Sequence, residues 1–160
     1  MEAVIGKILK AGGKTMATAE SCTGGYIAHL VTSVPGSSAY FKGSVVSYSN
    51  EVKEEVLGVK HETLQTTGAV SEETVKEMVE GVIRKLKVDY AVATTGIMGP
   101  DGGTEEMPAG TVWIAAGNAK EVETMKLNLR FDRERNISLT ATHALNFLRK
   151  FILKRQQYPG

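Results

Sequence analysis

The segment Ala19-Glu20-Ser21-Cys22-Thr23-Gly24-Gly25 joins a short apolar run, residues 15–19, to a stretch that begins at Tyr26. Apolar side chains at positions 26, 27, 30 and 31 have the spacing of an amphipathic helix. The segment therefore predicts a turn from a strand into a helix, and its two glycines would let a ligand approach the backbone closely.

Two roles are open for the hydroxyl groups of this turn. A helix start presents unpaired N–H groups and a partial positive charge, which could stabilise the oxyanion formed when Ser21 attacks a carbonyl group. The backbone of Cys22, Thr23 and Gly24 would then supply the donors. Alternatively, Ser21 or Thr23 only caps the helix. The local sequence favours neither role over the other.

The composition is that of a soluble globular protein. The 160 residues, 42% hydrophobic and 23% charged, predict one domain over residues 1–160. A formal net charge of +1 gives no reason to expect binding to nucleic acid or to a membrane surface. No apolar run could span a bilayer and no secretory signal opens the chain, so we expect a cytoplasmic protein. A single cysteine excludes an intrachain disulfide, and no Cys/His cluster predicts a metal site.

Hydrophobic periodicity predicts helices and strands in alternation. We expect helices around residues 4–9, after Tyr26, from a capping Asn50, from a capping Ser71, and from Asp132 to the end of the chain. Strands are expected at residues 40–48, 88–95, 111–116 and 125–131, the last of them an antiparallel edge strand, while His61 is expected in a loop.

Several polar features outside the first turn are candidates for ligand contacts. The segment Gly36-Ser37-Ser38 offers backbone and hydroxyl donors, although a plain loop is the commoner role. Residues 96–108 form a long glycine-rich loop, and such loops usually bind something. Arg133, at the start of the last helix, could help to hold an anion. Lys53 lies early in its helix, where the dipole disfavours a charged amine, although a solvated lysine is the commoner case.

Two common nucleotide-binding motifs fail here. Gly12-Gly13-Lys14-Thr15 looks like the end of a P-loop, but Ile8 stands where the motif needs glycine. Tyr48 and Lys53 are five positions apart, whereas the Tyr-x-x-x-Lys pair of short-chain dehydrogenases is four apart. No Gly-x-Gly-x-x-Gly motif follows a strand either, so the sequence disfavours a dinucleotide oxidoreductase.

Taken in order, several segments resemble one family. They are Ala19 to Gly25, Gly36-Ser37-Ser38, Val46 to Lys53, Gly68-Ala69-Val70-Ser71, Thr95-Gly96 through Gly102-Gly103, and Pro108 to Trp113. The resemblance is to the C-terminal domain family of CinA, the competence/damage-inducible protein, whose stand-alone members are nicotinamide-nucleotide amidohydrolases. It runs from about Val4 to Phe151, nearly the whole chain.

The resemblance implies hydrolysis of the carboxamide of nicotinamide mononucleotide to nicotinate mononucleotide and ammonia, a step of pyridine-nucleotide salvage that needs no metal or cofactor. The family's serine nucleophile falls on Ser21, and its tyrosine and lysine fall on Tyr48 and Lys53. The expected substrate-binding positions are Gly25, Gly36, Ser37, Ser38, Thr95, Gly96 and Arg133. The expected partner is a small nucleotide substrate, and self-association into a homo-oligomer stays open.

By resemblance the fold is a three-layer α/β/α sandwich around a mixed, partly parallel sheet. We expect a single domain without the further domain that the longer CinA proteins carry ahead of this one. Met98 and Phe131 depart from the family, which usually has a small residue and a glycine there, and both bear on the phosphate side of the site. Two alternatives remain: a nucleotide-binding module without catalysis, and a serine amidase for another small amide.

Overall fold

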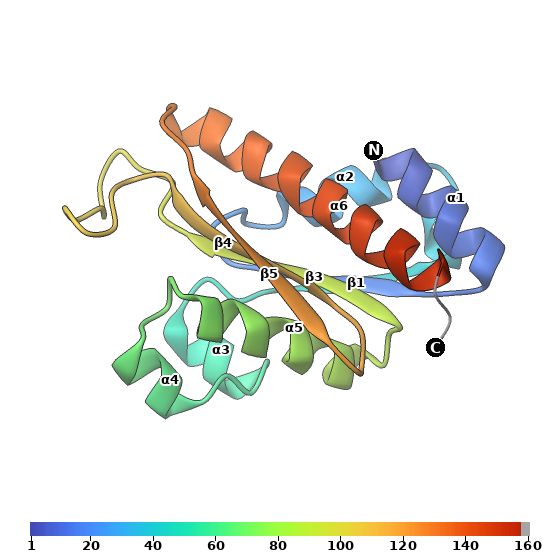
Figure 1. The fold of residues 1–160 in the computed structure, drawn as a ribbon, viewed down its shortest axis with the longest axis horizontal. Helices are drawn as coiled ribbons and strands as arrows, with labels where there is room; N and C mark the ends of the chain where they lie inside the picture. The colour runs from blue at the N-terminus through green and yellow to red at the C-terminus, as the bar shows by residue number, and fades with distance from the viewer. Residues whose placement is uncertain (158–160) are drawn as a thin grey trace.

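A five-stranded mixed sheet forms the middle layer of the computed structural model, which describes residues 1–157 (Figure 1). The strand order is β2-β1-β3-β4-β5. The first three of these are parallel to one another, and β4 and β5 continue the sheet in antiparallel pairing. The strands are β1 Met16–Glu20, β2 Phe41–Val46, β3 Tyr90–Gly96, β4 Thr111–Gly117 and β5 Val122–Asn128.

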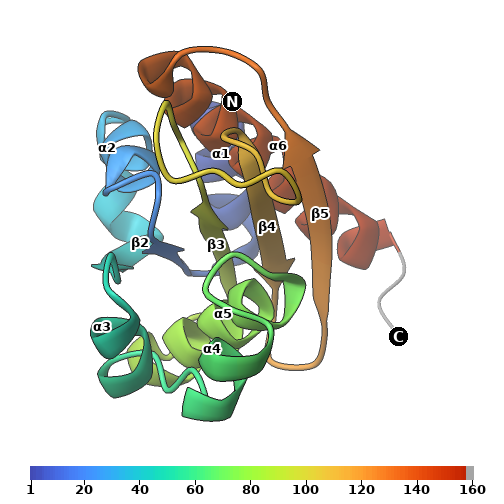
Figure 2. The ribbon, with the colours of Figure 1, turned by 90° about the vertical axis from the view of Figure 1, so that its left-hand side faces the viewer.

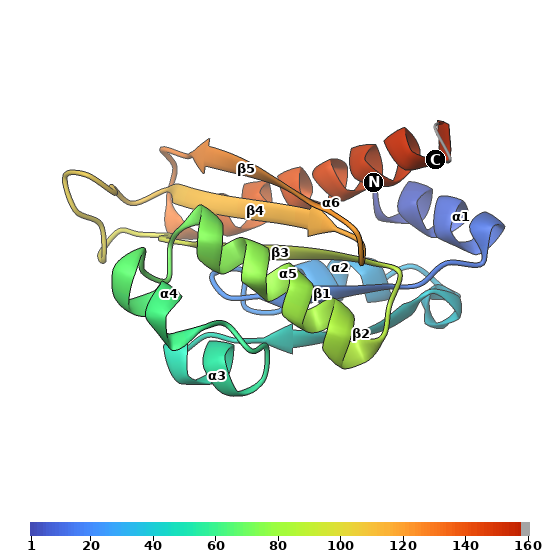
Figure 3. The same ribbon diagram turned by 60° about the horizontal axis from the view of Figure 1, so that its bottom comes forward.

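Helices cover both faces of the sheet (Figures 1 and 3). One layer holds α1 Glu2–Gly12, α2 Tyr26–Thr32 and α6 Arg133–Gln157, and the other holds α3 Asn50–Glu55, α4 His61–Thr66 and α5 Glu72–Leu86. A short 3-10 helix, η1 Ser37–Ala39, precedes β2. The predicted three-layer sandwich around a mixed sheet is confirmed. Among residues 1–157, no helix is both long and apolar enough to cross a membrane.

Two hydrophobic cores lie between the layers, and β1 contributes to both. Met16 packs in the core beneath α1, α2 and α6, whereas Ala17 and Ala19 pack in the core beneath α5. Successive side chains of a strand point to opposite faces, so Glu20 shares the face of Met16, and Ser21, the next residue, turns toward the other face. The alternation therefore directs Glu20 under α2 and Ser21 toward α3, where each finds its hydrogen-bond partners.

The three parallel strands end at one edge of the sheet. Their last residues are Glu20, Val46 and Gly96, and the turn before α2, the link to α3 and the long loop before β4 follow them. Figure 2 looks toward this edge, with α3 and α4 below and the long loop across the upper part. Ligands of open α/β sheets bind at the carboxyl ends of the strands, so this edge is where a site is expected.

Three local predictions are wrong. Ser49, not Asn50, caps α3, because its Oγ accepts the N–H of Val52. His61 begins α4 instead of lying in a loop, and its Nδ1 lies 2.7 Å from Oε1 of Glu54. The last strand ends at residue 128 and does not reach 131, although the alternation of apolar side chains continues, because pairing with β4 stops at its first residue.

Candidate active site

The turn at residues 21–25 holds the Ser21 hydroxyl at the edge of the sheet. The Ser21 N–H donates to the carbonyl of Thr94 (3.2 Å), which extends the pairing of β1 with β3 by one residue. The Gly24 N–H then donates back to the Ser21 carbonyl (3.0 Å) and closes the turn. Ser21 is only 7% exposed. Its Oγ is therefore fixed by backbone hydrogen bonds on both sides of the residue.

Lys53 meets this hydroxyl from α3. The Lys53 Nζ donates to the Ser21 Oγ (3.0 Å) and to the Ser47 carbonyl (2.7 Å). The Ser47 carbonyl is itself held in place, because the Ser47 N–H donates to the carbonyl of Glu20 (2.7 Å). Lys53 is 1% exposed, and among residues 1–157 no carboxylate forms a salt bridge with its amine. The structure thus brings together a serine hydroxyl and a buried lysine without a counterion.

Burial sets the protonation of both neighbouring groups. Removal from water lowers the pKa of Lys53 below its ordinary value of 10.5, and only a Cys22 thiolate would oppose this shift. Burial also raises the pKa of the Cys22 thiol to about 12, so the thiol is neutral at pH 7. The arrangement favours a neutral amine beside Ser21 and an unreactive Cys22.

A pocket of about 230 Å³ opens over this pair. Its walls come from the three segments at the carboxyl ends of the strands, from the loop before α5 and from the start of α6. The lining residues are Ser21, Cys22, Tyr48, Asn50, Lys53, Ala69, Val70, Thr95, Gly96, Ile97, Met98, Asp101, Gly102 and Arg133. Thr95 and Gly96, two of the predicted substrate-binding residues, thus line the pocket from the end of β3, and the Thr95 hydroxyl donates to the Ala69 carbonyl (2.7 Å).

Arg133 and Tyr48 meet at the rim of the pocket. The Arg133 guanidinium donates to the Gly99 carbonyl (2.8 Å) and to the Tyr48 hydroxyl (3.2 Å). Tyr48 is 64% exposed and forms no hydrogen bond with Lys53 in the described part of the chain. The structure thus pairs Tyr48 with Arg133, and the backbone carbonyl of Ser47 orients the Lys53 amine.

Gly36, Ser37 and Ser38 do not reach this pocket. They lie at the opposite end of β1, where the Met16 N–H donates to the carbonyl of Tyr40 (2.7 Å), and Gly36 lies near the amine of Lys10 on α1. The expectation that they bind the substrate together with Arg133 is not met within this chain. The local composition could not predict this, because strand direction decides at which end of the sheet a loop lies.

The helix start after the turn is already occupied. Glu20 accepts the N–H groups of Gly25, Ile27 and Ala28 at the start of α2 (3.2, 2.9 and 2.9 Å). Gly25 therefore serves as the N-cap of α2, at φ 99°, and does not line the pocket. The Gly24 N–H is also engaged, so Gly24 leaves the predicted set of oxyanion donors. Within residues 1–157, the N–H groups of Cys22 and Thr23 have no hydrogen-bond acceptor.

Glu20, Asn50 and Asp101 are site residues that the sequence analysis missed. Glu20 is 0% exposed and belongs to the first segment quoted above. The signal available in the sequence was an acidic residue directly after an apolar run. Asn50 lines the pocket as the first residue of α3. Asp101 reaches it from the long loop, and nothing in the local pattern distinguished it from the other acidic residues of that loop.

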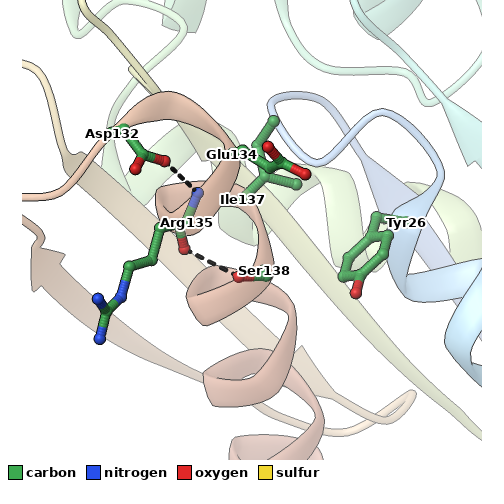
Figure 4. A pocket seen from close by; sticks show the side chains of 6 residues that line it. All are labelled: Tyr26, Asp132, Glu134, Arg135, Ile137 and Ser138. Carbon is green, nitrogen blue, oxygen red and sulfur yellow. Dashed lines mark hydrogen bonds between the residues drawn. The ribbon is translucent and has the colours of Figure 1, made fainter.

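A larger hollow lies on the other side of the start of α6. It measures about 510 Å³ and is bounded by Tyr26, Ile137, Ser138 and the charged residues of the first turn of α6 (Figure 4). In Figure 4 the Asp132 carboxylate accepts the N–H of Arg135, which makes Asp132 the predicted cap of the last helix. In the described chain, the residues that line this hollow form no contact like the one between Ser21 and Lys53 in the smaller pocket.

Comparison with known proteins places the chain in one family. The CinA C-terminal domain family matches residues 1–152. A CinA-like protein of Cytophaga hutchinsonii is 53% identical over 150 residues, which cover 94% of this chain and 36% of that protein. One of Endomicrobium trichonymphae is 48% identical, covering 99% of this chain and 37% of that protein. The chain thus spans little more than a third of these curated relatives.

Solved structures of similar proteins share the fold. A CinA superfamily protein of Klebsiella pneumoniae superposes with a TM-score of 0.92 at 35% identity, covering 96% of both chains. A competence/damage-inducible protein of Agrobacterium tumefaciens superposes with a TM-score of 0.90 at 38% identity, covering 92% of this chain and 90% of its own.

Proposed function

The chain belongs to the CinA C-terminal domain family, and on that premise we propose that it hydrolyses the carboxamide of nicotinamide mononucleotide to nicotinate mononucleotide and ammonia. The observation that carries the proposal is the 3.0 Å contact between the Ser21 hydroxyl and the buried Lys53 amine, which lacks a counterion in the described chain. A neutral amine at hydrogen-bond distance is the base that a serine nucleophile requires.

The reaction follows from these positions. Ser21 Oγ forms a bond with the carboxamide carbon as its proton passes to Lys53 Nζ, and the carbonyl oxygen becomes an oxyanion. The free N–H of Cys22, on the pocket wall, and that of Thr23 are the donors for that charge. Lys53 returns the proton to the departing nitrogen, ammonia leaves, and the acyl group stays on Ser21. Water then attacks the ester, giving its proton to Lys53, which passes it to Ser21 Oγ as the acid leaves.

The charges of the pocket suit this substrate. Nicotinamide mononucleotide carries a positive pyridinium ring and a negative phosphate. The pocket has one cationic side chain at its rim, Arg133, and one anionic side chain, Asp101, on the long loop whose Gly99 carbonyl Arg133 contacts. A pyridinium ring in the pocket would also disfavour protonation of Lys53, so substrate binding and the active form of the base support each other.

Product analysis tests this function directly. The purified chain is incubated with nicotinamide mononucleotide, with unrelated small amides in parallel, and nicotinate mononucleotide and ammonia are quantified. Equal amounts of the two products, with nicotinamide mononucleotide preferred, are expected. Ammonia from another amide alone would show a different serine amidase. Binding of the nucleotide without ammonia release would show a non-catalytic module.

We expect Arg133→Ala to weaken use of the nucleotide far more than use of nicotinamide riboside, which lacks the phosphate. A charged hydrogen bond contributes about 1.5–3 kcal/mol, so kcat/KM for the nucleotide should fall roughly 10- to 100-fold relative to the riboside. Steady-state kinetics on both substrates measures the ratio. The loss of the Arg133 contacts to Gly99 and Tyr48 should change kcat/KM for both substrates alike, so it cancels in the ratio of the two values.

Arg135→Ala is the matched control. Arg135 lies two positions further along the same helix, but its guanidinium stacks on the ring of Phe131 at 4.4 Å and does not line the pocket. We expect this variant to change neither substrate's kcat/KM appreciably. Equal losses for nucleotide and riboside in Arg133→Ala would remove the phosphate role.

A further inference from the structure

A buried carboxylate ties the nucleophile turn to its surroundings. Glu20, 0% exposed and adjacent to Ser21 in sequence, makes six contacts within hydrogen-bond distance of donor groups. Three come from the N–H groups at the start of α2, described above. The other three come from the hydroxyls of Thr18 on β1 (3.1 Å), Thr23 in the turn (2.7 Å) and Ser44 on β2 (3.4 Å). One side chain thus joins the sheet, the turn and the helix.

The hydrogen-bond directions are fixed by chemistry. An ionised carboxylate only accepts, so Thr23 must donate its single hydroxyl proton to Glu20. The hydroxyl of Thr94 on β3, 2.9 Å away, must then donate to Thr23. This relay locks the side chain of Thr23, whose own N–H remains without an acceptor among residues 1–157. Glu20 therefore orients the turn from the side opposite to Lys53.

We propose that Glu20 is a positioning residue for the amidase reaction: its carboxylate holds the Ser21-Cys22-Thr23 turn so that the Ser21 hydroxyl faces Lys53 and the free N–H groups face the pocket. The proposal rests on the proposed function. Glu20 does not touch the substrate, since it lies beneath α2 and does not line the pocket. The Glu20 backbone also helps to position the site. Its carbonyl accepts the N–H of Ser47, and the carbonyl of Ser47 accepts a hydrogen bond from Lys53 Nζ.

Glu20→Gln is the first test. The glutamine amide keeps the shape of the side chain but has an NH2 group in place of one carboxylate oxygen. This NH2 group would then lie against N–H groups and hydroxyls that are themselves donors, so hydrogen bonds are lost. Misplacement of reacting groups by about 1 Å can cost 10²-fold, so kcat should fall roughly 10- to 100-fold while KM changes less than about threefold. Glu20→Asp, which keeps the acceptor chemistry on a shorter stem, should recover part of the loss.

A second readout is independent of the substrate. A fluorophosphonate attached to a reporter phosphonylates an activated serine hydroxyl, and its rate of reaction at Ser21 is measured per folded molecule by mass spectrometry. We expect the rate to fall in Glu20→Gln with its dependence on pH unmoved, because Lys53 remains the base. A shift of the pH profile would instead show that Glu20 acts through charge, and would overturn the positioning role.

Glu77→Gln is the matched control. Glu77 is a half-buried carboxylate that accepts the Lys60 N–H (2.9 Å) and the Thr63 hydroxyl (2.7 Å), joining α5 to α4 on the far layer. Its loss should lower thermal stability without lowering kcat per folded molecule. If Glu20→Gln does the same, Glu20 is merely structural and the proposal is wrong.

Two further outcomes are decisive. If Glu20→Gln does not fold, Thr23→Val is used in its place, because it removes only the hydroxyl that links Thr94 to Glu20. We expect kcat to fall in this variant as well, by a smaller factor. An unchanged kcat would refute the proposal. If the wild type labels at Ser21 but releases no ammonia from the nucleotide, the proposed function fails while the labelling comparison still decides the role of Glu20. Absence of both activity and labelling would refute both.

Discussion

Lys53→Arg is expected to abolish turnover even though it keeps a positive charge and a long side chain. A guanidinium stays protonated at every accessible pH and cannot accept the proton of Ser21. General base catalysis contributes about 10²–10⁴-fold, so kcat should fall by at least 10²-fold. Lys53→Met should fail equally, with KM changed only a few-fold in both, because the hydrogen bonds of the amine are to Ser21 and Ser47 of the protein itself.

The dependence on pH has a definite sign. Because burial lowers the pKa of Lys53, the neutral, basic amine predominates above that lowered pKa and is lost as pH falls through it. The acid limb of kcat/KM should therefore rise with pH and level off well below 10.5, the ordinary value for lysine. A limb that extends to the ordinary value would show that Lys53 is not the base.

Lys42 supplies the control for these substitutions. It is an exposed lysine whose Nζ donates to a backbone carbonyl, that of Lys87, at 3.1 Å, as Lys53 does to Ser47. Lys42→Arg and Lys42→Met should leave kcat unchanged. Near-normal turnover in Lys53→Arg, with these controls intact, would rule out the amine as base and direct attention to a water-mediated one.

The same burial makes Lys53→Met informative about stability. The folded-state pKa lies below the unfolded one, so the unfolded state binds more protons between the two values and stability rises with pH across that window. At neutral pH the buried amine thus destabilises the native state. We expect the unfolding midpoint of Lys53→Met to exceed that of the wild type at pH 7, with the difference shrinking as pH approaches 10.5.

Local pattern predicted the turn that carries Ser21 and the long amphipathic helices. The apolar run before Ser-Cys-Thr-Gly-Gly predicted a strand that turns there, and β1, whose five residues are all buried, ends at Glu20. Long amphipathic segments such as α5 were predicted for the same reason, since periodicity and a capping Ser71 are local signals. The resemblance then predicted the mixed sheet. Its strand order was not predicted, because no local feature of the sequence indicates which strands are neighbours.

The remaining errors have a common cause in tertiary structure. Gly36-Ser37-Ser38 has a composition suited to anion binding, but strand direction places it at the amino end of β1. The helix start after the turn offered donors for an oxyanion, but the preceding Glu20 folds over and takes them. In both cases the local sequence could not predict whether a group is free to bind a ligand in the pocket. That depends on strand direction in the first case and on the position of a neighbouring side chain in the second.

The other large effect is expected from Ser21→Ala, which removes the nucleophile itself. Loss of a catalytic serine can cost about 10⁶-fold in kcat, and we expect activity here to fall by roughly 10⁴-fold or more. Cys22→Ala should retain most of the wild-type kcat, since the thiol, with its pKa raised to about 12 by burial, holds almost no thiolate at neutral pH. The adjacent positions thus serve as test and control for one another.

Trapping of the acyl-enzyme identifies the atom that attacks. The wild type is quenched in acid during turnover of nicotinamide mononucleotide, digested, and the peptide containing residues 21 and 22 is fragmented in a mass spectrometer. An ester on Ser21 is expected, and the same adduct should form in Cys22→Ala and not in Ser21→Ala. An adduct on the thiol, or loss of activity in Cys22→Ala with Ser21→Ala still active, would assign the nucleophile to Cys22. Because Lys53 Nζ lies 3.0 Å from Ser21 Oγ, within reach of its proton, the geometry predicts the ester.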